Sequence, residues 1–274
     1  MATSIHPTAI VDPKAQLADD VEVGPYAIVE GGVKIGAGCK IWQHVYIAGN
    51  TTLGTNNQIH PGAIVGHTPQ DLNWTGGPSQ TVIGNDNVIR EYVQIHRASK
   101  SGGTTRVGNN CYLMAGAHVA HDCTIGDKVI MANHVLLAGY VEIGDGAFLS
   151  GGALVHQFTR IGKLCILQGK SACGMHVPPY MLVAGINEVH GLNIVGMKRW
   201  PGLSAEAKAG IKEAYRLLYR SNLAPPEAIE QIAARQPVLP EVQEMIRFVK
   251  QVLDDVAPYR RGLCPAMRSY PTRS

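Results

Sequence analysis

Aromatic and charged side chains are scarce in this chain of 274 residues. Phe, Trp and Tyr make up 6% of it and charged residues 16%, against a globular average of about 25% charged. Lys and Arg (24) nearly balance Asp and Glu (21), so the net charge is only +3. This composition gives no support for disorder or for a general affinity for nucleic acids. It predicts a narrow core built from small aliphatic residues.

Long apolar runs and paired cysteines are also missing. No stretch approaches the roughly 20 apolar residues that span a bilayer. The start MATSIHPTAI has no charged region followed by an apolar one, so we expect a cytoplasmic protein without a transmembrane segment. The six cysteines form no CxxC pair, which argues against a zinc knuckle and a thioredoxin-like motif.

An aliphatic residue recurs every six positions along the first two thirds of the chain. The series runs from Ile5 to Val65, resumes in register at Ile83, and continues from Val107 to Cys173. A second, smaller residue follows four positions after each. This period fits neither an amphipathic helix nor an alternating strand. Most of the cysteines fall on these two positions, which predicts that they are buried as small hydrophobes.

A six-residue unit of this kind forms a short strand and a turn, and three units close a triangular coil. Coils then stack at the usual strand separation of about 4.8 Å, so residues 18 apart become vertical neighbours. Such hexapeptide repeats resemble the left-handed parallel β-helix, an exception to the right-handed crossover rule. We therefore predict an all-β left-handed parallel β-helix over residues 1–190.

Two polar, glycine-rich interruptions, at about 66–82 and 97–106, are expected to be loops leaving the prism. Residues 191–274 are expected to form a C-terminal α-helical domain, with a disordered tail from about 262. There Ser204 can cap one helix, Pro226 can open a second and Pro240 a third. The basic surplus of this domain fits either a solvated face or an anionic protein partner.

Histidines and a carboxylate gather in the segment AGAHVAHDCT. His118 and His121 are expected to project outward near one corner of the prism, with Asp122 beside them. This combination fits a general base oriented by an acid, a metal site or an ordinary surface. His60, His96 and His134 lack such neighbours, and we interpret them as structural.

The 18-residue rule places further residues beside this group. Gly139 lies one coil above His121 and Gln157 one coil above Gly139, with His156 next to the top of this stripe. Tyr140 lies one coil above Asp122 in the same way. A glycine directly over a histidine indicates a close approach of backbone to ligand and an N–H available to a developing oxyanion.

Eight motifs now identify a family: NQIHPGAIVG, PQDL, IREYVQIHR, AHVAHDCTIG, ALVHQF, HVPPY, GLNIVG and KEAYRLLYRS. Over nearly its whole length the chain resembles the acyl-carrier-protein-dependent acyltransferases that act on UDP-N-acetylglucosamine in the first step of lipid A synthesis. The resemblance implies a homotrimer with active sites between neighbouring prisms. It also implies no metal and no bound cofactor, because the acyl carrier protein brings the phosphopantetheine arm of the donor.

The resemblance assigns roles to individual positions. His121 matches the general base that deprotonates the sugar 3-hydroxyl, Asp122 the carboxylate that orients it, and Gly139 the oxyanion-hole N–H. The remaining implied positions are Asp71 and His118 around the glucosamine, Tyr140 in the substrate site, His156 and Gln157 near the pyrophosphate, Asn193 at the uridine, Gly169 for acyl-chain length, and Arg199 and Lys212 for the acyl carrier protein. The chain departs from the family pattern at Asn73, Tyr140, Asn187, Val195, Trp200 and Pro201.

Three alternatives stay open. The first is a metal enzyme resembling γ-carbonic anhydrase, although the His-x-x-His spacing differs from that family. The second is acylation of the amino group of a 3-amino sugar nucleotide by the same base. The third is a noncatalytic trimeric prism that binds partners through its helical domain.

Overall fold

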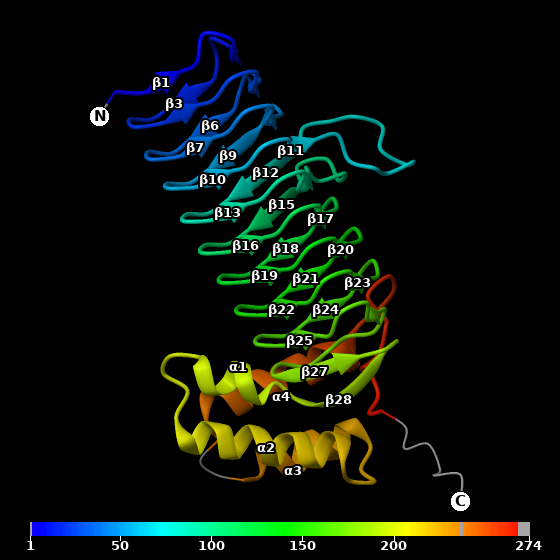
Figure 1. The fold of residues 1–274 in the computed structure, drawn as a ribbon. Helices are drawn as coiled ribbons and strands as arrows, with labels where there is room; N and C mark the ends of the chain where they lie inside the picture. The colour runs from blue at the N-terminus through cyan, green and yellow to red at the C-terminus, as the bar shows by residue number, and fades with distance from the viewer. Residues whose placement is uncertain (1, 236–237, 268–274) are drawn as a thin grey trace, which may run out of the picture.

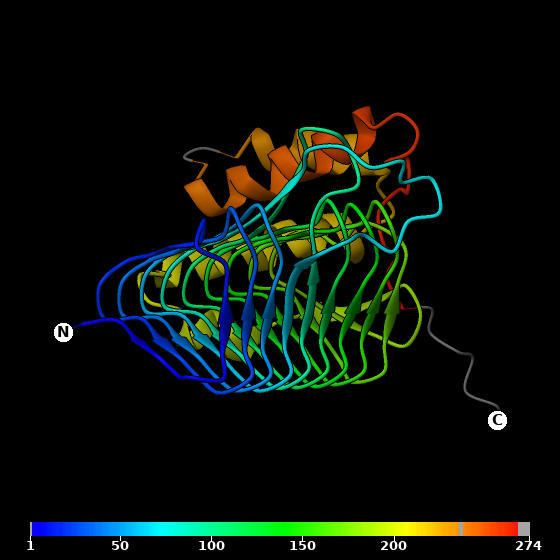
Figure 2. The same cartoon turned by 90° about the horizontal axis from the view of Figure 1, so that it is seen from above.

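The computed structural model describes residues 2–235 and 238–267, most of which form a three-sided prism of stacked coils (Figure 1). Each coil gives one short strand to each of three sheets, and Figure 2 shows these strands stacked in parallel rows. The first sheet contains β1 (Ser4–Ile5), β4 (Glu22–Val23), β7 (Lys40–Ile41), β10 (Gln58–Ile59), β13 (Val88–Ile89), β16 (Tyr112–Leu113), β19 (Ile130–Met131), β22 (Phe148–Leu149), β25 (Ile166–Leu167), β27 (Met181–Ala184) and β28 (Glu188–Leu192).

The other two sheets complete the prism. The second contains β2 (Ile10–Val11), β5 (Ile28–Val29), β8 (Tyr46–Ile47), β11 (Ile64–His67), β14 (Gln94–His96), β17 (His118–Val119), β20 (Leu136–Leu137), β23 (Leu154–Val155) and β26 (Ala172–Cys173). The third contains β3 (Gln16–Leu17), β6 (Lys34–Ile35), β9 (Thr51–Leu53), β12 (Gln80–Ile83), β15 (Thr104–Val107), β18 (Thr124–Ile125), β21 (Glu142–Ile143) and β24 (Arg160–Ile161).

The pairing register confirms the vertical neighbours predicted from the repeat. His118 pairs with Leu136, and Leu136 pairs with Leu154, so one coil takes 18 residues as expected. The register lengthens only where a loop is inserted, as between Ile64 and Gln94. The repeat therefore fixes which side chains lie above one another.

The prism interior consists of the predicted aliphatic positions. From Val23 to Cys173 these residues are no more than 3% exposed, whereas Ile5 in the first coil is 46% exposed because no coil covers it. Each buried Val, Leu or Ile contributes about 1.5–3 kcal/mol. The cysteines of the repeat are buried as well, and burial raises the pKa of Cys111 to about 11 and of Cys123 to about 12.

The two loops leave the prism at one corner. Residues 68–79 join β11 to β12 and residues 97–103 join β14 to β15, so both connect the second sheet to the third. We call this edge the loop corner. The backbone N–H of Gly102 donates to Pro78 O (2.6 Å) and that of Gln80 to Gly103 O (3.1 Å), so the two loops support each other.

Among the described residues, four helices follow the prism, where the sequence predicted three. They are α1 (Ile194–Arg199), α2 (Ala205–Tyr219), α3 (Pro225–Ala233) and α4 (Pro240–Asp254), and they lie at the end of the prism away from the N-terminus (Figure 1). Ser204 caps α2 as expected, accepting from the N–H of Ala207. The prediction missed the six-residue α1 because its only start signal is an asparagine side chain, and α3 begins at Pro225, one residue before Pro226.

The segment after α4 folds back onto the last coils, contrary to the disordered tail predicted from residue 262. Cys264 N–H donates to His176 O (2.8 Å) and Met267 N–H to Val189 O (2.9 Å), so this segment pairs with backbone groups at the C-terminal end of the prism. The rest of that predicted tail, residues 268–274, lies outside the described residues. In the described part of the chain no helix combines the length and apolarity needed to cross a bilayer.

Candidate active site

The His118–Asp122 segment lies at the loop corner, in the coil that follows the second loop along the chain. It comprises β17 and most of the turn that leads to β18, which again joins the second sheet to the third. Asp122 has a φ of 60°, a left-handed conformation that aspartate tolerates better than most residues. Its backbone N–H donates to Thr105 Oγ1 on β15 (2.9 Å), which anchors the turn to the coil below.

His121 and Asp122 form a buried pair. His121 Nδ1 lies 2.9 Å from Asp122 Oδ2, and the two side chains are 7% and 8% exposed. Because the carboxylate accepts the proton on Nδ1, Nε2 keeps its lone pair in the neutral imidazole. Burial opposes ionisation of Asp122, but hydrogen bonds from His121 and Ser99 outweigh it and hold the pKa of this carboxyl below its usual value. The loops explain why His121, expected to project outward, is only 5% exposed.

Gly139 lies against the free nitrogen of this histidine. A Cβ at Gly139 would stand 2.6 Å from His121 Nε2 and 2.5 Å from its Cε1, so any side chain there would displace the imidazole. The Gly139 carbonyl accepts from Phe158 N–H (3.1 Å) in the coil above. Within the described residues the Gly139 N–H donates to no backbone acceptor. The vertical stripe predicted from the 18-residue rule is therefore confirmed.

A cavity of about 400 Å³ opens beside the pair. Five of the predicted site residues line it: Asp71, His118, His121, Gly139 and Gln157. Asp71 comes from the first loop, where the backbone N–H of Asn73 donates to its carboxylate (2.9 Å). That hydrogen bond, with smaller contributions from Ser99 and His121, lowers the pKa of Asp71 despite partial burial. The structure thus gathers these residues from the first loop and three coils.

His118 is neutral at physiological pH. Burial, followed by the nearby His96 and His121, lowers the pKa of His118 to about 4. Its ring meets the His96 ring edge-on, with centroids 5.2 Å apart. His96 Nδ1 lies 2.6 Å from Thr68 O in the first loop, and burial lowers its pKa as well. His96, interpreted from the sequence as structural, therefore braces a residue that lines the cavity.

Two residues that the sequence analysis missed hold Asp122. Ser99, in the second loop, donates to Asp122 Oδ2 from both its backbone N–H (2.8 Å) and its hydroxyl (3.0 Å). Thr105 accepts from the Asp122 backbone, as described above. The 18-residue rule cannot place a loop residue, so only the serine's position in a predicted loop could have drawn attention to it. Tyr140 closes the group, with its ring edge-on to His121 at 5.4 Å.

A second cavity, of about 550 Å³, continues over the face of the second sheet. It is lined mainly by apolar residues, including the exposed Leu136 and Leu154, and His118 borders both cavities. His156 and Asn187 line this second cavity and not the first. His156 Nδ1 lies 3.1 Å from Gln157 O. Gly169 lies in the turn from β25 of the first sheet to β26 of the second, so it is at the edge of the second sheet opposite the loop corner.

The remaining predicted residues lie elsewhere in the chain. Asn193 is 6% exposed and caps α1: its Oδ1 accepts from Gly196 N–H (2.9 Å) and its Nδ2 donates to Leu164 O (2.8 Å). Both polar atoms of the Asn193 side chain, which was predicted to contact the uridine, are thus hydrogen-bonded to the backbone. Arg199 and Lys212 are exposed on α1 and α2.

Trp200 marks a third corner of the prism, between the third and first sheets. Its ring packs over the backbone of Gly146, with the ammonium groups of Lys128 and Lys163 at 5.3 and 5.9 Å from the ring centre. Val195, near the start of α1, is 58% exposed. The positions at which the chain departs from the family pattern around the nucleotide are therefore remote from His121 within one chain.

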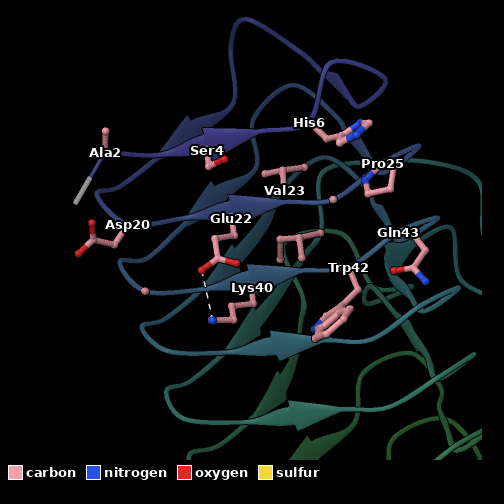
Figure 3. A pocket seen from close by; sticks show the side chains of 13 residues that line it. Ala2, Ser4, His6, Asp20, Glu22, Val23, Pro25, Lys40, Trp42 and Gln43 are labelled. Carbon is pink, nitrogen blue, oxygen red and sulfur yellow. Dashed lines mark ion pairs between the residues drawn. The ribbon is translucent and has the colours of Figure 1, made fainter.

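A larger cavity, of about 830 Å³, lies at the N-terminal end of the prism (Figure 3). Its walls include Trp42 and an ion pair between Lys40 Nζ and Glu22 Oε1 (3.2 Å). It contains none of the predicted site residues and no buried acid–base pair among its lining side chains, so size alone does not locate the chemistry. Among the described residues, no three His, Cys, Asp or Glu side chains are grouped as metal ligands.

Comparison with known proteins gives a consistent result. A family model described as Udp N-acetylglucosamine O-acyltransferase, domain 2, matches residues 176–264, and a model of bacterial transferase hexapeptide repeats matches residues 32–67 and 104–139. The acyl-[acyl-carrier-protein]–UDP-N-acetylglucosamine O-acyltransferase of Syntrophobacter fumaroxidans is 47% identical, over 89% of this chain and 96% of its own. The protein of the same name from Synechocystis is 44% identical over 98% and 96%.

Solved structures agree with these sequence relatives. The UDP-N-acetylglucosamine O-acyltransferase of Moraxella catarrhalis is 38% identical with a TM-score of 0.85, over 90% of this chain and 96% of its own. The UDP-N-acetylglucosamine acyltransferase of Campylobacter jejuni is 34% identical with a TM-score of 0.87, over 97% and 100%. The predicted left-handed parallel β-helix with a C-terminal helical domain is thereby confirmed.

Proposed function

The chain belongs to the acyl-[acyl-carrier-protein]–UDP-N-acetylglucosamine O-acyltransferase family, and from this premise we propose that His121 is the general base of its reaction. The protein is an acyltransferase that moves an acyl chain from acyl carrier protein to UDP-N-acetylglucosamine in lipid A biosynthesis. One observation carries the proposed mechanism. The buried His121–Asp122 pair leaves Nε2 facing a cavity, with the backbone of Gly139 against it.

In this mechanism the 3-hydroxyl of the sugar loses its proton to His121 Nε2 as its oxygen attacks the thioester carbonyl carbon. Asp122 holds the proton on Nδ1, so the imidazole presents the correct tautomer and its cation is stabilised. The carbonyl oxygen becomes an oxyanion, to which the Gly139 N–H donates. The C–S bond then breaks, and the imidazolium returns the proton to the leaving phosphopantetheine thiolate.

Direct transfer needs no covalent enzyme intermediate. Cys123 is the cysteine nearest in sequence to the pair, and burial raises its pKa to about 12, so its thiol is not ionised at neutral pH. A neutral histidine acting between two bound substrates is sufficient. We infer a site in which the thioester and the sugar are held together.

The cavities suggest where each substrate lies. Asp71, His118 and Gln157 line the cavity beside His121 and are proposed to bind the glucosamine and pyrophosphate, with His156 at the border. The apolar cavity over Leu136 and Leu154 is proposed to take the acyl chain as far as Gly169. The exposed Arg199 and Lys212 are proposed to receive the acidic carrier protein, which delivers the acyl group on its phosphopantetheine arm.

A homotrimer would complete the nucleotide site. Trp200 and the start of α1 lie at a different corner from His121, so we propose that they reach the nucleotide from a neighbouring subunit. In this arrangement Asn193 shapes the uridine pocket by capping α1 instead of bonding the base directly. Analytical ultracentrifugation of the full chain tests the trimer, and a monomer with full activity would contradict it.

The function is tested by acyl transfer from 3-hydroxyacyl carrier protein to UDP-N-acetylglucosamine. We expect the wild type to acylate the hydroxyl and His121→Ala to lose at least about 1,000-fold in kcat, the scale of a lost general base with its orienting partner. His134→Ala serves as the matched control, because His134 is exposed at another corner. Transfer only to the 3-amino analogue would assign N-acylation, and transfer to neither acceptor would refute the proposed reaction.

A further inference from the structure

Ser99 is the one loop side chain that bonds directly to the catalytic carboxylate within the described residues. Its hydroxyl and its backbone N–H both donate to Asp122 Oδ2, at 3.0 and 2.8 Å. The same oxygen accepts from His121 Nδ1 at 2.9 Å. Three donors therefore converge on a single oxygen of a side chain that is 8% exposed. Such a charge-assisted arrangement fixes the carboxylate more firmly than any one of these bonds could.

We propose that Ser99 is a positioning residue for acyl transfer, which sets the orientation of Asp122 and the share of its negative charge that reaches His121. This inference rests on the proposed role of His121 as the base. Because the Ser99 hydroxyl neutralises part of the charge on Oδ2, it moderates the basicity that the carboxylate confers on the imidazole. The serine thus holds the carboxylate, and through it the imidazole, in place.

The second loop is built to present this serine. Ala98, next to it, is fully buried, and Gly103 N–H donates to Lys100 O (2.8 Å), closing the loop tightly. A Cβ at Gly103 would lie 3.0 Å from Asp122 Oδ1 and 2.8 Å from Lys100 O. The loop therefore encloses both carboxylate oxygens, with donors on one side and a glycine on the other.

Tyr140 supports the same group from the coil above. Its hydroxyl lies 3.5 Å from Ser99 Oγ, beyond the length of an ordinary O–H···O bond, and its ring stacks on Phe158 at 4.7 Å. The serine hydroxyl donates to Asp122, and the tyrosine hydroxyl lies beside it. Tyr140 therefore limits the directions in which Ser99 can rotate.

Other charged or titratable groups also face the base. They are Asp71 from the first loop, His96 from β14, His118 from β17, Tyr140 from the coil above, and Asp122 itself, whose charge also acts on Tyr259 of the segment after α4. A change in the pH profile must therefore be traced to Asp122 specifically. An Asp122→Asn background, in which this side chain carries no charge, makes that distinction.

The experiment measures kcat, KM and the pH dependence of kcat/KM for the full chain with acyl carrier protein and UDP-N-acetylglucosamine. We expect Ser99→Ala to lower kcat about tenfold with KM for the nucleotide within about twofold, the scale of one hydrogen bond to a charged group. We expect the acidic limb of the profile to move to higher pH by about 0.5 to 1 unit. Ser99→Thr, which keeps both donors, should restore both values.

Two further variants separate positioning from folding. Ser101→Ala changes an exposed serine of the same loop and should match the wild type. In an Asp122→Asn background, Ser99→Ala should no longer move the acidic limb, because no carboxylate charge is left to moderate.

The inference is overturned if Ser99→Ala keeps the wild-type kcat and pH profile while His121→Ala is inactive. It is equally overturned if kcat falls with an unshifted profile and a lowered melting temperature, since that indicates a purely structural role. Failure of the wild type itself to transfer the acyl chain would instead refute the proposed function.

Discussion

Replacing Gly139 by alanine tests the geometry of the proposed base, His121, most directly. The new methyl group would stand 2.5 Å from His121 Cε1 and 2.6 Å from Nε2. Carbon atoms in contact sit about 3.5–4.0 Å apart, so the imidazole must move by about 1 Å or the turn must shift. Gly139 is not among the glycines with positive φ, so alanine introduces no backbone strain there. Because the atoms that the methyl group would meet belong to the His121 side chain, we expect the imidazole to move and the turn to keep its conformation.

A displacement of about 1 Å in a catalytic group costs about 100-fold in rate, or about 2.7 kcal/mol of activation free energy. We expect kcat of Gly139→Ala to fall by about this factor, and KM for both substrates to change little. Alanine also restricts the unfolded chain, which contributes about 0.4–1 kcal/mol of stability and offsets part of the clash. The melting temperature should therefore stay close to that of the wild type.

The assay is steady-state acyl transfer combined with thermal unfolding. Gly151→Ala is the matched control, because its Cβ would meet Asn133 O at an ordinary 3.5 Å and its φ is not positive either. A Gly139→Ala enzyme within about threefold of the wild type would show that the imidazole does not react from its observed position. Loss of folding in Gly139→Ala alone would refute the claim that the turn tolerates alanine.

Three further predictions concern pH, stability and specificity. Folding lowers the pKa of His118 from its ordinary value of 6.5 to about 4, so between these pH values the unfolded state binds more protons and the free energy of unfolding rises with pH. His118→Gln should flatten that rise, as measured by urea titrations at several pH values. An unchanged dependence of the free energy of unfolding on pH would contradict this prediction. Asp255 pairs with the buried Arg160 (2.6 Å) and His176 (3.2 Å). Asp255→Ala should therefore lower the free energy of unfolding by about 3 kcal/mol, the lower end of the range for breaking a buried ion pair. A loss below about 1 kcal/mol in urea titrations would show that this pair does not stabilise the fold. Gly169→Met should shift the preferred donor to a shorter acyl chain in a competition assay, and an unchanged preference would remove Gly169 from the acyl site.

The periodic part of the fold was readable from the sequence because one rule covers every coil. A six-residue period places each aliphatic inside and each eighteenth residue above the last, so the stripe of His121, Gly139 and Gln157 followed from counting. The same rule could not place Ser99 or Asp71, because loop residues have no periodic neighbour to fix them. Their position depends on how two loops pack at one corner.

Tertiary packing also decided where side chains of known type would act. Asn193 was predicted as a ligand contact, but its side chain is bonded to the N–H of Gly196 in the first turn of α1 and to the carbonyl of Leu164. The segment from residue 262 has no periodic pattern, yet the open backbone of the last coils pairs with it. The sequence by itself determined the prism, its register and the proximity of His121 and Asp122. The structure decided which loops, helix caps and chain ends surround that pair, because those contacts join residues that no local pattern links.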